Sequence, residues 1–325
     1  MISRCRLPRV LGTAAALALA VVAGCSGDSG RPPSPTDDTA TTSGPTGEPG
    51  EPGESGDPDE AMRLLLNTGT ATSAGRAGRA DTAAIPLALR ERSGGDFGQG
   101  RLTFHTASAA PVEQYVQVEY PAGSASRSAA RDHETNDVGA QSYWPLVDGP
   151  LEDAYLRYQV WFPDDFNFVK GGKLPGLYGG HATSGGHIPD GSDGFSTRYM
   201  WRENGAAEVY AYLPTSSEHG TSLGRGAWSW PTGRWACIEQ RVTLNAPGES
   251  NGSVQVWLDE RPVLDQGGLR FRDTDRLRID GLFFSTFFGG GDESWATPTD
   301  QIVRFGGFAI STQRLGCAAH SSTGK

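Results

Sequence analysis

From about residue 101 onward, apolar and polar side chains alternate in short runs that are separated by clusters of glycine, proline and aspartate. Successive side chains of a β-strand point to opposite faces, so this period of two predicts strands that each bury one face. The clearest runs are 116–120, 155–162, 238–244, 254–258, 279–288 and 305–310. No long amphipathic helix interrupts them, and the chain holds 45 glycines and 21 prolines. We therefore expect an all-β domain over residues 101–318, built as a sandwich or jelly roll of two antiparallel sheets.

The first residues have the pattern of a targeting segment. Arg4, Arg6 and Arg9 precede an apolar run over 11–22, which is short for a membrane span. The run leads into Val-Ala-Gly-Cys at 22–25, which resembles a bacterial lipobox. That resemblance implies a signal peptide over 1–24, acylation of Cys25, and export to the outer side of the cell membrane, where the lipid is the chain's only membrane contact.

The segment between this anchor and the sandwich is polar. Residues 25–60 are rich in Gly, Pro, Ser, Thr, Asp and Glu, which predicts a disordered linker, because so few apolar side chains cannot offset the entropy of ordering. Residues 61–100 form an N-terminal segment that we expect to be partly ordered, and 83–92 could be a short helix. Residues 319–325 are a tail.

The net charge of the chain limits the classes of molecule that it can bind. The chain carries a net charge of −10, and loss of residues 1–24 with their three arginines makes it more negative. An acidic chain is a poor partner for nucleic acid, and one that binds a polyanion must gather its few cations in one place. We expect a monomer that binds an acidic polysaccharide and needs no cofactor.

Two cysteines remain after Cys5 leaves with the signal and Cys25 is acylated. Cys237 and Cys317 can pair in an oxidising compartment. The alternative is two separate buried thiols. We predict the disulfide, which would fasten the C-terminus to the sandwich.

Four polar residues fall on one face of a predicted hairpin. Ser196 and Arg198 point the same way along their strand, and so do Tyr210 and Tyr212 on the next. A turn around 204–205 joins the two strands, so that these side chains can lie together. The alternative for the tyrosine pair is ordinary core packing, but an unpaired arginine beside it is rarely buried.

Spaced motifs over most of 101–317 resemble the alginate and glucuronan lyases of polysaccharide lyase family 14. They are Tyr-Pro-Ala-Gly-Ser at 120–124, Gly-Gly-Lys-Leu-Pro-Gly-Leu at 171–177, Phe-Ser-x-Arg-x-Met-Trp at 195–201, Glu-x-Tyr-x-Tyr at 208–212 and Phe-Ser-Thr-Phe-Phe-Gly-Gly at 284–290, followed by Trp295 and Asp300. The resemblance implies a β-jelly roll, or concanavalin-like sandwich, with a concave cleft. It also implies a catalytic set that matches Lys173, Ser196, Arg198, Tyr210 and Tyr212.

A β-eliminating lyase must neutralise the uronate carboxylate, remove the neighbouring ring proton and protonate the leaving oxygen. Lys173 or Arg198 can meet the carboxylate. Nearby cations would lower the pKa of a tyrosine, so that Tyr210 or Tyr212 could be base or acid. Lys173 is an alternative base, and His181 could contact substrate or serve as base.

Other readings stay open at this point. A carbohydrate-binding protein of the same fold would lack turnover. A sandwich-type glycoside hydrolase would carry a Glu-x-Asp-x-Glu run, which the sequence lacks. Asp190 and Asp193 could hold a structural calcium ion, whereas a zinc site lacks a third close ligand, so we assign no metal ligands.

Overall fold

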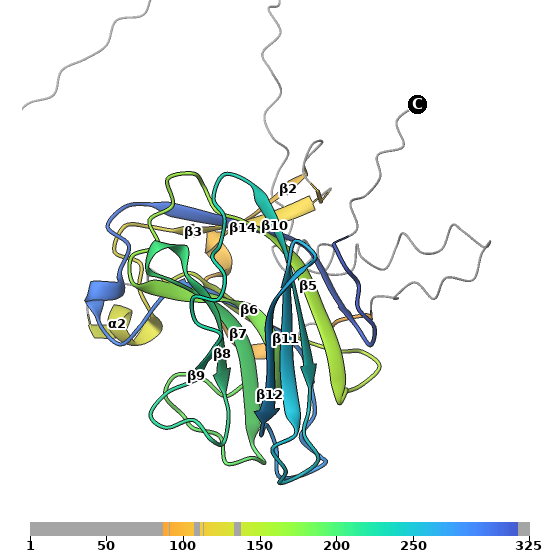
Figure 1. Ribbon diagram of the computed structural model, residues 1–325. Coiled ribbons are helices and arrows are strands. Elements are labelled where there is room, and N and C mark those ends of the chain that lie inside the picture. The colour runs from red at the N-terminus through yellow and green to blue at the C-terminus, as the bar shows by residue number, and fades with distance from the viewer. Residues whose placement is uncertain (1–86, 91, 107–110, 113, 133–137, 318–325) are drawn as a thin grey trace, which may run out of the picture. The chain divides into compact units, whose positions relative to one another are not determined.

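The structure, a computed structural model, describes residues 87–90, 92–106, 111–112, 114–132 and 138–317 (Figure 1). Its strands form two seven-stranded sheets in which the paired strands run antiparallel. The expected all-β sandwich is therefore confirmed. The first sheet, in spatial order, comprises β1 (Arg92–Phe97), β4 (Ala140–Pro145), β13 (Gly281–Phe288), β6 (Gly171–Gly180), β7 (Gly194–Arg202), β8 (Ala207–Tyr212) and β9 (Thr221–Leu223).

The second sheet packs face to face against the first across the core. In spatial order it comprises β12 (Arg261–Leu269), β11 (Gly252–Leu258), β10 (Trp235–Thr243), β5 (Asp153–Trp161), β14 (Gln301–Ser311), β3 (Gln114–Tyr120) and β2 (Leu102–Thr106). Among the described residues, helical turns lie in connections between strands: η2 (Gln99–Arg101), α2 (Arg127–Asp132), η3 (Glu203–Gly205) and η4 (Glu293–Trp295). No helix among the described residues has the length and apolar character needed to cross a membrane.

The core lies between the sheets and follows the alternation in the sequence. In β3, Val116, Val118 and Tyr120 are fully buried, whereas the intervening Gln117 and Glu119 are not. In β7, Tyr199 and Trp201 join the same core, and their neighbours turn to the opposite face of the first sheet. That outer face carries the polar residues on which the function depends.

The short helix considered for 83–92 is not found in the described part of that range. Within it, residues 87–90 have no helical turn, and Leu89 pairs with Leu146 in an isolated β-bridge and is buried. The reason is tertiary: the core gives the leucine more burial than a short isolated helix could. Strand β1 follows and pairs with β4, so the first sheet begins before residue 101. Cys25 and the expected signal, linker and tail lie outside the described residues.

The disulfide between Cys237 and Cys317 is confirmed, with the two Cα atoms 5.8 Å apart. Beside it, the backbone N–H groups of Leu315 and Gly316 donate to the buried carboxylate of Glu239, at 2.7 and 3.2 Å. The covalent bond and this carboxylate together fasten the end of the described chain to β10.

We predict that Cys237→Ser combined with Cys317→Ser lowers the free energy of unfolding by up to about 4 kcal/mol, because the bond closes a loop whose ends are 80 residues apart. Urea unfolding of the variant and of the parent measures the difference. Equal unfolding midpoints for the double variant and the parent would show that the bond does not constrain the unfolded chain.

Candidate active site

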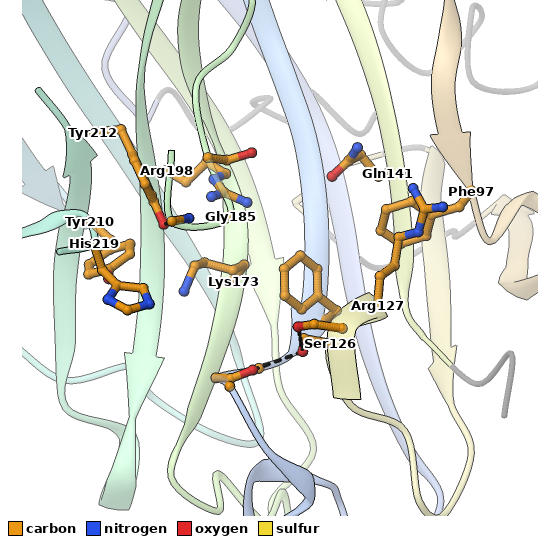
Figure 2. Close-up of a pocket in the computed structure, with 17 residues that line it drawn as sticks. Phe97, Ser126, Arg127, Gln141, Lys173, Gly185, Arg198, Tyr210, Tyr212 and His219 are labelled. Carbon is orange, nitrogen blue, oxygen red and sulfur yellow. Dashed lines mark hydrogen bonds between the residues drawn. The ribbon is translucent and has the colours of Figure 1, made fainter. Parts of the chain in front are cut away.

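A cleft of about 350 Å³ lies on the outer face of the first sheet. Figure 2 shows Lys173 and Arg198 on its floor, with Tyr210, Tyr212 and His219 along one side. Figure 2 shows Phe97, Ser126, Arg127 and Gln141 on the other side. The lining also includes Ser128, Phe287 and Gly289 to Gly291.

The pairing of β7 with β8 brings the predicted residues together. Ser196 lies opposite Tyr212 and Arg198 opposite Tyr210, so the predicted shared face is confirmed. Lys173 enters from β6, where the register shifts just after it, between Leu174 and Gly176. Four of the five predicted residues line the cleft, because adjacent strands place them on one surface.

Ser196 is the exception. Its side chain is fully buried and its hydroxyl donates to the backbone oxygen of Thr183 at 2.7 Å. Thr183 leads into a glycine-rich loop whose Gly186 N–H donates to the Tyr212 hydroxyl at 3.1 Å. The serine therefore holds a loop that in turn contacts a tyrosine of the cleft, and its hydroxyl is not offered to a ligand.

The two floor cations are deeply buried. Lys173 is 8% exposed and Arg198 is 2% exposed. The lysine Nζ lies 4.3 Å from the centroid of the Tyr210 ring and donates to the sulfur of Met200 at 2.8 Å, a weak acceptor. The guanidinium of Arg198 lies 4.7 Å from the Phe283 ring centroid and donates to Ser285 Oγ at 3.1 Å.

Among the described residues, neither Lys173 nor Arg198 forms a salt bridge with a carboxylate. Within the described part of the chain, the nearby salt bridges are made by other arginines, and the Nε of Arg198 is buried without any hydrogen bond. No Asp or Glu is among the described residues that line the cleft. A buried cation without a counter-ion is costly, so the floor is suited to an anionic group that comes from outside.

Burial holds the pKa of Lys173 well below its ordinary value, and the charges of Arg198 and Arg202 lower it further, while Glu208 raises it. Burial also lowers the pKa of Arg198, but a guanidinium starts so high that it keeps its proton. The floor therefore holds one permanent cation and one amine that can give up its proton.

Glu208 offsets this positive charge only in part. Its fully buried carboxylate accepts from the Nε and the terminal nitrogen of Arg202, at 2.9 and 2.5 Å. The same guanidinium lies 5.4 Å from the Tyr210 ring centroid. Residues 208, 210 and 212 share a strand face, so the Glu-x-Tyr-x-Tyr pattern could have predicted that the Glu208 carboxylate lies beside the tyrosines.

The pKa of Tyr210 differs from the value expected from the sequence. Burial, and after it the neighbouring Tyr212, raise the pKa of its hydroxyl to about 12, although Arg202 and a hydrogen bond from the Gly220 backbone lower it. The expected lowering by cations is therefore wrong for this residue, because desolvation outweighs it. A Cβ atom at Gly220 would lie 2.7 Å from the tyrosine ring, so only glycine lets the loop approach this closely.

The histidines also differ in placement. His181 is exposed and is not among the residues that line the cleft, whereas His219 is. No motif marked His219, since it reaches the cleft through the loop between β8 and β9.

The carboxylate of Asp190, considered as a calcium ligand, accepts from the backbone N–H groups of Ser192 and Asp193 and from the Ser192 hydroxyl. No three His, Cys, Asp or Glu side chains of the described ranges could jointly hold a metal ion, and the calcium site stays a prediction.

Comparison with known proteins identifies the family of the chain. The family model for polysaccharide lyase 14 matches residues 108–308. The PL-14 alginate lyase from Aplysia kurodai is 32% identical over 67% of this chain and 90% of its own, with a TM-score of 0.59. Two further structures share the fold at lower identity. Alginate lyase Aly36B is 20% identical over 72% of this chain and 97% of its own, with a TM-score of 0.55. Alginate lyase vAL-1 from Chlorella virus is 19% identical over 66% of this chain and 89% of its own, with a TM-score of 0.54. No protein with a curated description matches the chain.

The protonation of Lys173 can be measured directly, because the chain has only three lysines. We predict that ¹³C-lysine NMR shows one signal that titrates well below the ordinary value of about 10.4 and that disappears in Lys173→Met. Glu208→Gln should lower that pKa further, because it removes the one carboxylate that favours the ammonium form. A Lys173 signal that titrates at the ordinary value would contradict this description of the cleft.

Proposed function

The chain belongs to polysaccharide lyase family 14, and we propose that it cleaves alginate by β-elimination in the cleft on the first sheet. As a member of that family it is a lyase of uronate polysaccharides. Alginate is proposed because the alginate lyase from Aplysia kurodai is 32% identical to it. The observation that carries the proposal is the pair of buried cations, Lys173 and Arg198, which lack a carboxylate partner within the described chain.

Elimination defines what the cleft must supply. A base removes the proton at C5 of the uronate, the electrons form a C4–C5 double bond, and the C4–oxygen bond breaks. The leaving oxygen takes a proton from an acid. Negative charge builds up on the carboxylate as the proton leaves, so a fixed cation beside it lowers the barrier.

Arg198 supplies that cation. Its guanidinium keeps its charge at all relevant pH values and can bind a carboxylate through two parallel hydrogen bonds. Its Nε has no partner among the described residues, and its position over the Phe283 ring limits its movement. Carboxylate binding would give this buried charge its missing partner.

Lys173 serves as the base in this proposal. Its lowered pKa leaves more of the neutral amine at neutral to alkaline pH than an exposed lysine has, and only the neutral amine can accept a proton. This choice replaces the tyrosine base considered from sequence, since the hydroxyl of Tyr210 has a raised pKa and stays protonated.

Tyr210 serves as the acid. The lysine Nζ lies 4.3 Å from its ring centroid, so base and acid border the same small volume. The Gly220 backbone donates a hydrogen bond to its hydroxyl and would stabilise the phenolate left after proton transfer. Tyr212, whose ring centroid is 5.7 Å away, fixes the neighbouring loop through Gly186 and borders the sugar.

The cleft disfavours hydrolysis by a carboxylate pair. Such hydrolases need two Asp or Glu residues that flank the bond, and none lines the cleft among the described residues. A binding protein without turnover would need the cations but no titratable amine. We therefore expect products that absorb ultraviolet light, because the new double bond is conjugated with the carboxylate.

We predict that Lys173→Arg and Tyr210→Phe each lower kcat by about 10²–10⁴-fold. Arginine keeps the positive charge but cannot lose its proton, and phenylalanine keeps the ring but has none to give. The parent's kcat/KM should rise with pH as Lys173 deprotonates, with a midpoint below that of an ordinary lysine. It should not fall until pH approaches the pKa of Tyr210, about 12.

The measurement is ultraviolet absorbance during the cleavage of alginate, with Lys170→Arg as the matched control, since Lys170 is exposed and does not line the cleft. That control should behave like the parent. A Lys173→Arg variant with the parent's rate and pH profile would remove the lysine from the role of base.

We also propose that the enzyme is exported and held at the outer side of the membrane by a lipid on Cys25. The support is the lipobox-like sequence at 22–25 alone. We predict that the mature protein partitions with membranes and that Cys25→Ser is released or misprocessed, as judged by fractionation and mass spectrometry. A Cys25→Ser variant that fractionates and migrates like the parent would contradict the proposal.

A further inference from the structure

The side of the cleft opposite the tyrosines has no part in the proposed elimination. Figure 2 shows Phe97 at the end of β1, Gln141 on β4 and Arg127 at the start of α2 on this side. Phe287 also lines the cleft, from β13, which lies between β4 and β6. The guanidinium of Arg127 lies 5.1 Å from the centroid of the Phe97 ring. The rings of Phe97 and Phe287 are 6.4 Å apart and tilted by 54°.

Gln141 is fixed by its neighbours. Its amide nitrogen donates to the backbone oxygen of Gly95 at 2.8 Å and to the hydroxyl of Tyr143 at 3.1 Å. Its amide oxygen accepts from the Ser285 hydroxyl at 3.3 Å. The Ser285 hydroxyl in turn accepts from the Arg198 guanidinium at 3.1 Å. A continuous hydrogen-bond network therefore links this side of the cleft to the reactive floor.

The start of α2 is also held in place. The hydroxyl of Ser126 donates to the backbone oxygen of Gly290 at 2.8 Å and accepts from the backbone N–H of Ala129 at 3.3 Å. These contacts join α2 to the loop after β13, so that the backbone of Arg127 is fixed at the edge of the cleft.

The chemistry of this side matches one sugar unit of an acidic polymer. A uronate offers a carboxylate, a C–H face of its ring and several hydroxyls. A guanidinium pairs with the carboxylate, aromatic rings pack against the C–H face, and a side-chain amide bonds a hydroxyl. The lining of the cleft carries three cations and no acid among the described residues, although the chain as a whole has a net charge of −10.

We propose that Phe97, Arg127 and Gln141 form a second uronate subsite, which binds a sugar of the polymer away from the bond that is cut. This subsite rests on the proposed function, since it extends the same cleft. It makes no contact with the reacting atoms, so it strengthens the binding of longer chains and leaves the chemical step unchanged.

The test is steady-state kinetics of Arg127→Ala on polymeric alginate and on the shortest oligosaccharide that the parent cleaves. We expect KM for the polymer to rise about three- to tenfold while kcat changes by less than about twofold, because the lost interaction is equally strong in the ground and transition states. KM for the shortest oligosaccharide should not change. Phe97→Leu should show the same selectivity for length.

Arg276→Ala is the matched control, because Arg276 is exposed, does not line the cleft and carries the same charge. It should leave both KM values unchanged. If Arg127→Ala leaves KM for the polymer at the parent's value, or raises KM for both substrates equally, the subsite is excluded while the proposed function stands. Thermal unfolding of each variant shows whether the fold is retained.

The two proposals can fail separately. If the parent does not cleave alginate, the proposed substrate is wrong, and the subsite is then tested by titration calorimetry with alginate and with carboxyl-reduced alginate. Weaker binding of alginate by Arg127→Ala than by Arg276→Ala, with no such difference for the neutral polymer, supports the subsite. Equal binding by both variants excludes it.

Discussion

Burying Lys173 and Arg198 in one cleft without a carboxylate is costly, because a charge taken out of water loses far more free energy than a neutral group does. The protein meets this cost in two ways. The pKa of Lys173 is lowered, so that the ammonium group can lose its proton. The guanidinium of Arg198 lies against the face of the Phe283 ring and donates to Ser285. What remains is a fixed positive charge without a counter-ion, which a uronate carboxylate can neutralise.

The sandwich is what holds these charges in place. Arg198 and Met200 lie on the outer face of the first sheet because Tyr199 and Trp201 face the core, and a shift of one residue in β7 would exchange the two sets. The large buried rings therefore fix the register, and through it the position of the arginine. Loops then complete the site, with Gly186 and the segment around Gly220 contacting the two tyrosines.

Much of this could be read from the sequence, since strands with a clear period of two carry the information locally. The shared face of Ser196, Arg198, Tyr210 and Tyr212 followed from that period and from the hairpin between them, and the structure confirms it. Strand β1 carries no such signal, because it contains two glycines and gains its stability by pairing with β4.

The parts that were missed depend on tertiary structure. His219 and Arg127 reach the cleft from connections whose course no local pattern describes, and His181, chosen for its place in a motif, is exposed outside it. The pKa of Tyr210 was misjudged for the same reason: the sequence shows the neighbouring cations, but the burial that outweighs them appears only when the sheets are packed.

In this mechanism a uronate carboxylate pairs with the buried guanidinium of Arg198 while Lys173 removes the neighbouring ring proton. A crystal structure of the Tyr210→Phe variant with an alginate oligosaccharide tests it most directly. We expect a carboxylate within hydrogen-bond distance of the Arg198 guanidinium, with C5 of the same sugar facing Lys173 Nζ. An oligosaccharide that binds with its carboxylates turned to solvent, or outside this cleft, would contradict it.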